Sequence, residues 1–115
     1  MPPARTIIVD RCKLLESIQR IAAEQHADAI DRSAHWREQD RPRALSRTEW
    51  VPRDLQLLAG RPLTESERKR HQQAMVEMES EGVVALGVRL VKLLPAGAEY
   101  LAERHSAGQR NRGNR

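Results

Sequence analysis

The sequence has little cysteine, few aromatic residues and no long hydrophobic run. Cys12 is the single cysteine, which excludes an internal disulfide and a CxxC metal or redox motif. Aromatic residues make up 3% of the 115 residues and hydrophobic residues 39%, which indicates one domain with a modest core. No stretch approaches the roughly 20 apolar residues that span a bilayer, so we expect neither a transmembrane protein nor a membrane partner.

The sequence also lacks the long apolar region and the small-residue cleavage site of a secretory signal, so we expect the protein in the cytoplasm. Its charge is moderately basic, because 20 Lys and Arg residues against 16 Asp and Glu residues give a formal net charge of +4. The segment 104–115 carries four arginines and no acid, so residues 1–103 are neutral as a whole. The excess of positive over negative charge favours a polyanionic partner.

A stripe of apolar residues predicts a first helix, which follows an N-terminal arm at residues 1–9 and runs to about Ala29. Asp10 is placed to act as its N-cap. The stripe has the spacing of three and four residues that one helix face requires, and it consists of Leu14, Leu15, Ile18, Ile21 and Ala22.

The segment 31–47 has a proline and no apolar period, and it is interpreted as a polar connecting loop. Leu45 to Trp50 fits a short strand, although a capping box in the same stretch also fits a helix start. Proline suits the first turn of a helix. We therefore expect a second helix from Pro52 to Ala59, with Gly60 as its left-handed C-cap residue.

A capping box marks the third helix. Thr64 is placed to cap the helix while Glu67 reaches back to the backbone of Thr64. Gly82 is suited to the positive φ angle that commonly ends a helix. The prediction is a helix over residues 65–81.

The remaining elements are a hairpin and a fourth helix. The segment from Val83 to Leu94 is rich in Val and Leu and is interrupted by Gly87, which predicts two short strands around a tight turn. Pro95 then opens a helix to Glu103. The residues 104–115 are expected to form a basic, disordered tail.

Two motifs flank the predicted hairpin. Met78-Glu79-Ser80-Glu81-Gly82-Val83-Val84 is similar to the junction between recognition helix and wing, and Leu93-Leu94-Pro95-Ala96-Gly97-Ala98-Glu99-Tyr100-Leu101 is similar to the motif that ends the wing. In this order they resemble winged helix-turn-helix DNA-binding domains, over residues 50–103. The resemblance implies a mainly α fold with a small β-hairpin, in which a three-helix core and a C-terminal helix form a single domain over residues 10–103.

The third helix is the candidate recognition helix, which enters the major groove in this family. A helical wheel places His71, Met75 and Met78 on the core side. Its first half carries bases and its second half carries acids, which is opposite to the preference of the helix dipole and favours an external anion. The candidate DNA-binding residues on this helix are Arg68, Lys69, Arg70, Gln72 and Gln73.

Four cationic residues outside this helix are further candidates for DNA binding. Arg53 and Arg61 flank the second helix and suit phosphate contacts, which position a protein on DNA without reading its sequence. Arg89 and Lys92 are the charges of the predicted hairpin, and their parity predicts that they face different sides.

Enzymatic chemistry has little support in the sequence. The histidines lack the spacing of a helical metal site, and no phosphate-binding glycine loop or nucleophile elbow is present. Cys12 is expected to be a half-buried structural thiol, and Trp36 and Trp50 are expected to anchor the core. We therefore predict no catalytic residue, no metal and no cofactor.

The sequence thus predicts a non-catalytic protein that binds double-stranded DNA, as a small transcriptional regulator or an accessory DNA-binding protein. The alternative is a winged-helix protein–protein interaction or assembly module that binds no nucleic acid, which the neutral body and short hairpin favour. Under either function a homodimer can form through the first helix, with a seam at Leu14, Ile18 and Ile21.

Overall fold

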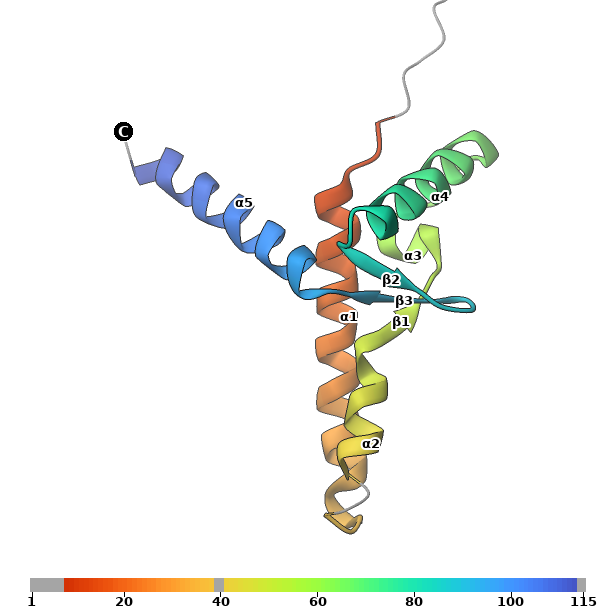
Figure 1. The fold of residues 1–115 in the computed structure, drawn as a ribbon, viewed down its shortest axis with the longest axis vertical. Coiled ribbons are helices and arrows are strands. Elements are labelled where there is room, and N and C mark those ends of the chain that lie inside the picture. Colours follow the sequence, from red (N-terminus) through yellow and green to blue (C-terminus); the bar gives the residue numbers. More distant parts are fainter. Residues whose placement is uncertain (1–7, 39–40, 114–115) are drawn as a thin grey trace, which may run out of the picture.

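The computed structural model describes residues 8–38 and 41–113, which form several helices and a small antiparallel sheet (Figure 1). The predicted arm falls almost wholly on residues 1–7, outside the described part of the chain. In chain order, the elements are α1 (Arg11–Arg32), the 3-10 turn η1 (Ser33–His35), α2 (Arg41–Ser46), the 3-10 turn η2 (Arg47–Glu49), β1 (Trp50–Pro52), α3 (Leu55–Ala59), α4 (Glu65–Ser80), β2 (Val84–Leu86), β3 (Leu90–Leu93) and α5 (Pro95–Gly113).

Helix α1 is the long central element against which most of the others pack, whereas α4 packs mainly on α3 and β2 (Figure 1). Its predicted N-cap is confirmed, since the side chain of Asp10 accepts a hydrogen bond from the backbone N–H of Lys13 at 3.1 Å. Leu14 and Ile18 are fully buried in the core of the same chain. The predicted dimer seam is therefore wrong at these two positions, because their side chains already pack against α1's own neighbours.

The segment 31–47 was predicted to be a loop, and the structure corrects this prediction. Helix α1 continues to Arg32, and η1, α2 and the start of η2 follow within the same stretch. The turn before β1 is held by α1, because the amide of Gln25 donates to the backbone oxygens of Thr48 and Trp50 at 2.9 and 3.0 Å. These contacts join residues far apart in the sequence, so a local pattern does not reveal them.

The predicted boundaries of the first strand and second helix are also wrong. Pro52 ends strand β1 instead of opening a helix, and proline is tolerated there because β1 lies at the edge of the sheet, whose order is β1-β3-β2. Helix α3 starts at Leu55, after Asp54 caps it by accepting from the backbone N–H groups of Gln56 and Leu57. The predicted left-handed Gly60 is confirmed, with φ of 74°.

Helix α4 agrees with its prediction. Thr64 and Glu67 form both hydrogen bonds of the capping box, at 3.1 and 3.2 Å. The helix ends at Ser80, and Gly82 takes a φ of 76°. The backbone N–H of Val83 then donates to the carbonyl of Met78 at 3.0 Å, as in a Schellman ending.

Strands β2 and β3 confirm the predicted hairpin, because they pair with each other in antiparallel orientation. The turn differs in detail from the prediction, because the N–H of Gly87 bonds the carbonyl of Leu90 at 2.9 Å and the positive φ falls on Arg89, at 58°. Arg89 therefore lies in the turn, not in a strand, so the argument from strand parity does not apply to it.

Helix α5 starts at Pro95, as predicted, and packs closely on the hairpin. A Cβ atom at Gly97 would lie 2.5 Å from the carbonyl oxygen of Val83, so this close approach requires glycine. The helix continues to Gly113 instead of ending near Glu103. Residues predicted as a disordered tail thus continue α5, since no proline interrupts the helix after Pro95.

The core lies between α1, α4 and the sheet. Its fully buried members include Leu15, Val51, Met75, Val84 and Val91. Trp36 is 50% exposed, so its prediction as a core anchor is wrong. Among the described helices, none has both the length and the apolarity needed to cross a bilayer.

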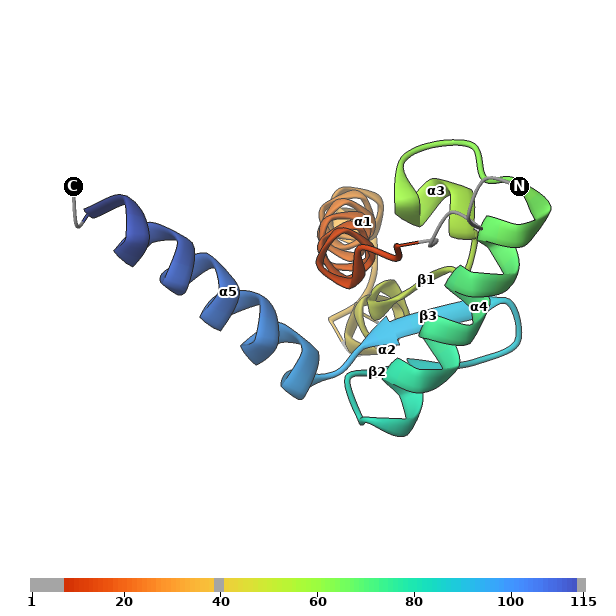
Figure 2. The ribbon, with the colours of Figure 1, turned by 90° about the horizontal axis from the view of Figure 1, so that it is seen from above.

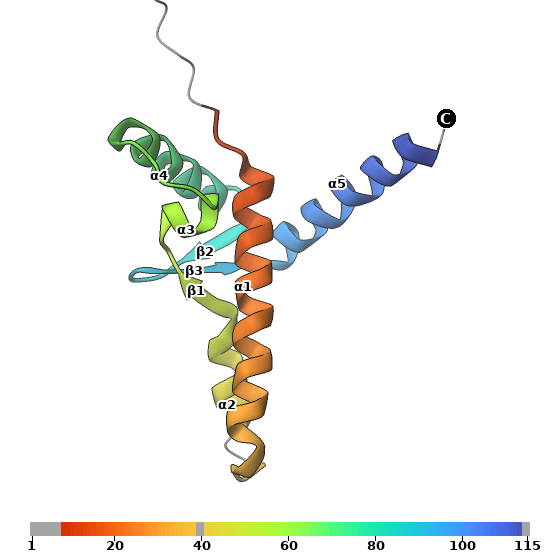
Figure 3. The same ribbon diagram turned by 180° about the vertical axis from the view of Figure 1, so that it is seen from behind.

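Helices α4 and α5 lie on opposite sides of α1 (Figures 2 and 3). Strands β2 and β3 connect them and cross in front of α1 in the view of Figure 1. The last turns of α5, up to Gly113, therefore lead away from α4 and do not extend the surface of that helix.

Candidate nucleic-acid interface

Helix α4 has one buried side and one open side. His71, Ala74, Met75 and Met78 are between 0% and 5% exposed, and Nδ1 of His71 lies 2.7 Å from the carbonyl oxygen of Glu67. The opposite side is exposed at Lys69, Gln72, Gln73, Val76 and Ser80. We call these five residues the exposed strip. Its side chains are free to meet a partner because the rest of the described chain does not cover them.

The acids in the second half of α4 face the protein itself. Glu77 and Glu81 form ion pairs with Arg11 of α1, at 2.6 and 3.1 Å, and the hydrogen bond to Glu81 is the main cause that raises the pKa of Arg11. A carboxylate oxygen of Glu79 accepts from the backbone N–H of Leu86 at 3.1 Å. These acids fix α4 to α1 and to the hairpin, and the single charge of Arg11 offsets part of their negative charge.

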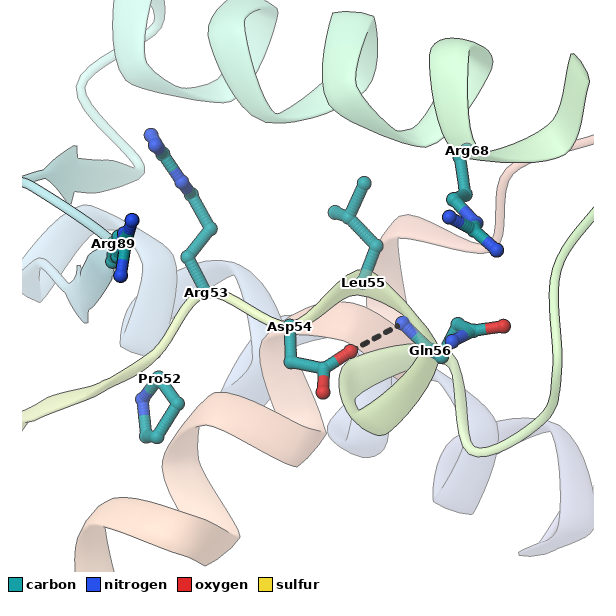
Figure 4. A pocket seen from close by; sticks show the side chains of 7 residues that line it. All are labelled: Pro52, Arg53, Asp54, Leu55, Gln56, Arg68 and Arg89. Atoms are coloured by element: carbon teal, nitrogen blue, oxygen red, sulfur yellow. Dashed lines mark hydrogen bonds between the residues drawn. The ribbon is translucent and has the colours of Figure 1, made fainter. Parts of the chain in front are cut away.

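Three predicted site residues meet in one hollow, of about 420 Å³. Arg53 follows β1, Arg68 stands in the first half of α4, and Arg89 forms the turn of the hairpin. Figure 4 shows Arg53 directed toward α4 and Arg68 directed from α4 toward α3. The backbone supports this arrangement, because the N–H of Arg53 donates to the carbonyl of Arg89 at 2.9 Å.

The hollow carries little compensating negative charge. Asp54 is the one acid in its lining, and its carboxylate caps α3 and points away from α4 (Figure 4). Within residues 8–38 and 41–113, Arg53, Arg68 and Arg89 form no ion pair and no side-chain hydrogen bond. Three guanidinium groups that line one concave surface have the geometry and charge to bind an anion with several oxygen atoms.

Two other predicted site residues, unlike the three arginines of the hollow, form ion pairs within the protein. Arg61 pairs with Glu67 at 2.7 Å. Lys92 pairs with Glu49 at 2.9 Å, and its ammonium lies 5.9 Å from the centre of the Trp50 ring. Both cations are therefore held by acids of this chain, which reduces the charge they offer to a phosphate.

The remaining predicted cations of α4 have weaker partners. Lys69 lies 3.7 Å from Glu65, and both side chains are highly exposed, at 79% and 88%. Arg70 donates to the amide oxygen of Gln73 at 3.0 Å. Arg70 lies on the opposite flank of α4 from Arg68, beside Ala74 and Glu77 in a second hollow. The two arginines thus border the exposed strip on its two sides.

The carboxylate of Glu67 helps to organise this end of α4. Its pKa is lowered mainly by the hydrogen bond from the backbone N–H of Thr64 and, to a smaller extent, by the hydrogen bond from Arg61. Both contacts favour the charged form. Glu67 is therefore a negative cap at the start of α4 and also holds the turn that carries Arg61.

Cys12 and Arg104 meet on the other side of α1. The guanidinium Nε of Arg104 donates to the sulfur of Cys12 at 3.4 Å and the guanidinium lies 5.5 Å from the centre of the Tyr100 ring. The hydrogen bond to Cys12 is the main cause that raises the pKa of Arg104. Cys12 is partly buried, and Arg104 serves to fix α5 against α1.

Two members of the exposed strip, Ser80 and Val76, are absent from the sequence-based set of site residues, and the apolar one is Val76. It is 51% exposed and lies one helical turn after Gln72 and Gln73. The signal was present in the helical wheel, where an apolar β-branched residue stands among polar ones. Only its exposure in the folded structure shows that Val76 lies outside the core.

No group of three or more His, Cys, Asp and Glu side chains in the described chain is arranged to hold a metal ion. In comparisons with protein-family models, curated proteins and solved structures, the chain matches none of them. The proposal that follows therefore rests on the geometry and charge of this surface.

Proposed function

We propose that the protein binds double-stranded DNA without catalysis, as a small transcriptional regulator or an accessory DNA-binding protein. In this proposal the fold is a winged helix-turn-helix, with α3 and α4 as the helical pair and β2–β3 as the wing. Two observations support this assignment: the order α1, β1, α3, α4, β2, β3, α5 and the sheet order β1-β3-β2. Helix α4 is the element that enters the major groove.

The observation that carries the proposal is the hollow lined by Arg53, Arg68 and Arg89 beside the exposed strip of α4. These three residues come from separate elements, and their cations have no acidic partner among the residues that the structure describes. Close placement of like charges is unfavourable in the free protein. A phosphate backbone compensates all three charges at once, because it carries negative oxygens at regular intervals.

The surface divides into groups that hold the DNA and groups that read it. Arg68 and Arg70 flank the exposed strip, as the two phosphate backbones flank a major groove, while Arg53 and Arg89 extend the contact on the Arg68 side. Between them, Gln72 and Gln73 face the base edges, together with Lys69. Glutamine pairs with adenine through two hydrogen bonds, and lysine donates to guanine.

The test is a titration of a fluorescently labelled random-sequence duplex at several salt concentrations. We expect the affinity to fall steeply as salt rises, and we expect the combined variant Lys69→Ala, Gln72→Ala and Gln73→Ala to bind more weakly. Arg20→Ala is the matched control, because Arg20 is an exposed cation on α1 paired with Glu24. A salt-independent affinity, or equal binding by the combined variant, would contradict the proposal.

A protein-interaction module is the second candidate function. Ile30 and Trp36, near the C-terminal end of α1, are 49% and 50% exposed, and such apolar side chains favour a protein partner. If the protein is such a module and binds no nucleic acid, it will not bind a duplex even at low salt. The same titration therefore separates the two functions.

A further inference from the structure

Val76 stands at the centre of the exposed strip and is its one apolar member. It is 51% exposed, whereas Met75 beside it is fully buried. On the helix surface its neighbours one turn earlier are Gln72 and Gln73, and Ser80 follows one turn later. An isolated valine is thus surrounded by polar groups that face outward.

Helix formation does not explain this valine. β-Branched residues are poorer helix formers than alanine or the straight-chain polar residues, so helix propensity does not favour valine at this position. The two glutamines beside it present amide groups, and the amide oxygen of Gln73 already accepts from Arg70 at 3.0 Å. That contact leaves the NH₂ group of Gln73 free to donate outward.

The major groove offers one apolar group, which is the 5-methyl group of thymine. We propose that Val76 packs against a thymine methyl while Gln72 or Gln73 pairs with a nearby adenine, so that the protein selects sites containing A·T base pairs. This inference rests on the proposed binding of DNA by α4. It assigns a role in specificity to a residue that contributes no charge and no hydrogen bond.

The experiment starts with selection of bound duplexes from a library with a randomised ten-base-pair core. Each thymine of the enriched duplex is then replaced by uracil, which pairs identically but lacks the methyl group. At one thymine we expect binding by the unaltered protein to weaken about fourfold, the effect of losing one buried methyl group. Val76→Ala should bind the thymine duplex about as weakly and should no longer distinguish thymine from uracil.

Ile30→Ala is the matched control, because Ile30 is an equally exposed aliphatic residue on a different helix. It should keep the full response to thymine. If the protein binds duplexes but selects sites without A·T pairs, or binds thymine and uracil duplexes equally, the role of Val76 is overturned while DNA binding stands. If it binds no duplex, the proposed function is overturned together with this inference.

Discussion

Arg89 shows how a single residue links the fold to the proposed site. It has a φ of 58°, the one positive value at a non-glycine position in the described chain. Such a conformation costs on the order of 1 kcal/mol relative to glycine. A glycine here would relieve the strain, yet the position carries a guanidinium group that lines the hollow with Arg53 and Arg68.

Replacing Arg89 by glycine should therefore separate stability from binding. We expect Arg89→Gly to leave the free energy of unfolding unchanged or to raise it by up to about 1 kcal/mol, since the relief of strain outweighs the entropy of glycine in the unfolded chain. The affinity for a duplex should fall about threefold to tenfold through the loss of one phosphate contact. Urea denaturation and anisotropy titration measure the two quantities.

Arg89→Ala provides the control for this experiment. Alanine removes the charge but keeps the strained backbone, so it should lose the same affinity without any gain in stability. Full binding by both variants would show that the guanidinium of Arg89 does not contact DNA.

At the scale of elements, the sequence predicted well those helix ends whose free backbone N–H or C=O groups are satisfied by residues nearby in the sequence. The capping box of Thr64 and Glu67, the N-cap Asp10 and the left-handed Gly60 were all identified from the sequence and are confirmed. Each depends on contacts within a few residues. The start of α5 at Pro95 belongs to the same class of signal.

Other elements depended on contacts between distant residues and could not be predicted in the same way. Pro52 fits a helix start as well as an edge strand, and only its pairing opposite Leu90 decides between them. The turn before β1 is held by Gln25, more than twenty residues earlier. The candidate residues of α4 were identified by their helical spacing, but the grouping of Arg53 with Arg68 and Arg89 required the fold.

The start of α4 leads to a prediction about pH. Because the pKa of Glu67 is lowered in the folded state, its charged form stabilises the fold fully above the ordinary glutamate value of 4.5. This contribution is lost as the pH falls through the lowered value. The difference in unfolding free energy between the unaltered protein and Glu67→Gln should therefore be constant near neutral pH and shrink in acid.

Urea denaturation between neutral and strongly acidic pH measures this difference. Glutamine can still form the capping box, so the variant isolates the charge. Glu65→Gln is the matched control, because it removes a charge from the same helical turn without the contacts to Thr64 and Arg61. A Glu67→Gln difference that grows in acid would contradict this role of the carboxylate.

At the scale of the whole molecule, the distribution of charge matters more than its sum. The formal net charge is +4 and residues 104–115 account for it, yet α5 leads that segment away from α4 (Figure 2). The candidate interface instead draws on arginines from a part of the chain that is neutral as a whole. The acids Glu77, Glu79 and Glu81 contact Arg11 and the backbone of Leu86, and none of them lines this hollow.

The most direct test of this account is the dependence of duplex affinity on salt for single arginine variants. Plots of log affinity against log salt concentration should lose about one unit of slope for each of Arg53→Gln, Arg68→Gln and Arg89→Gln. Arg20→Gln, which alters an exposed arginine paired with Glu24, should keep the original slope. Identical slopes for all four variants and the unaltered protein would contradict the claim that these three arginines bind the phosphate backbone.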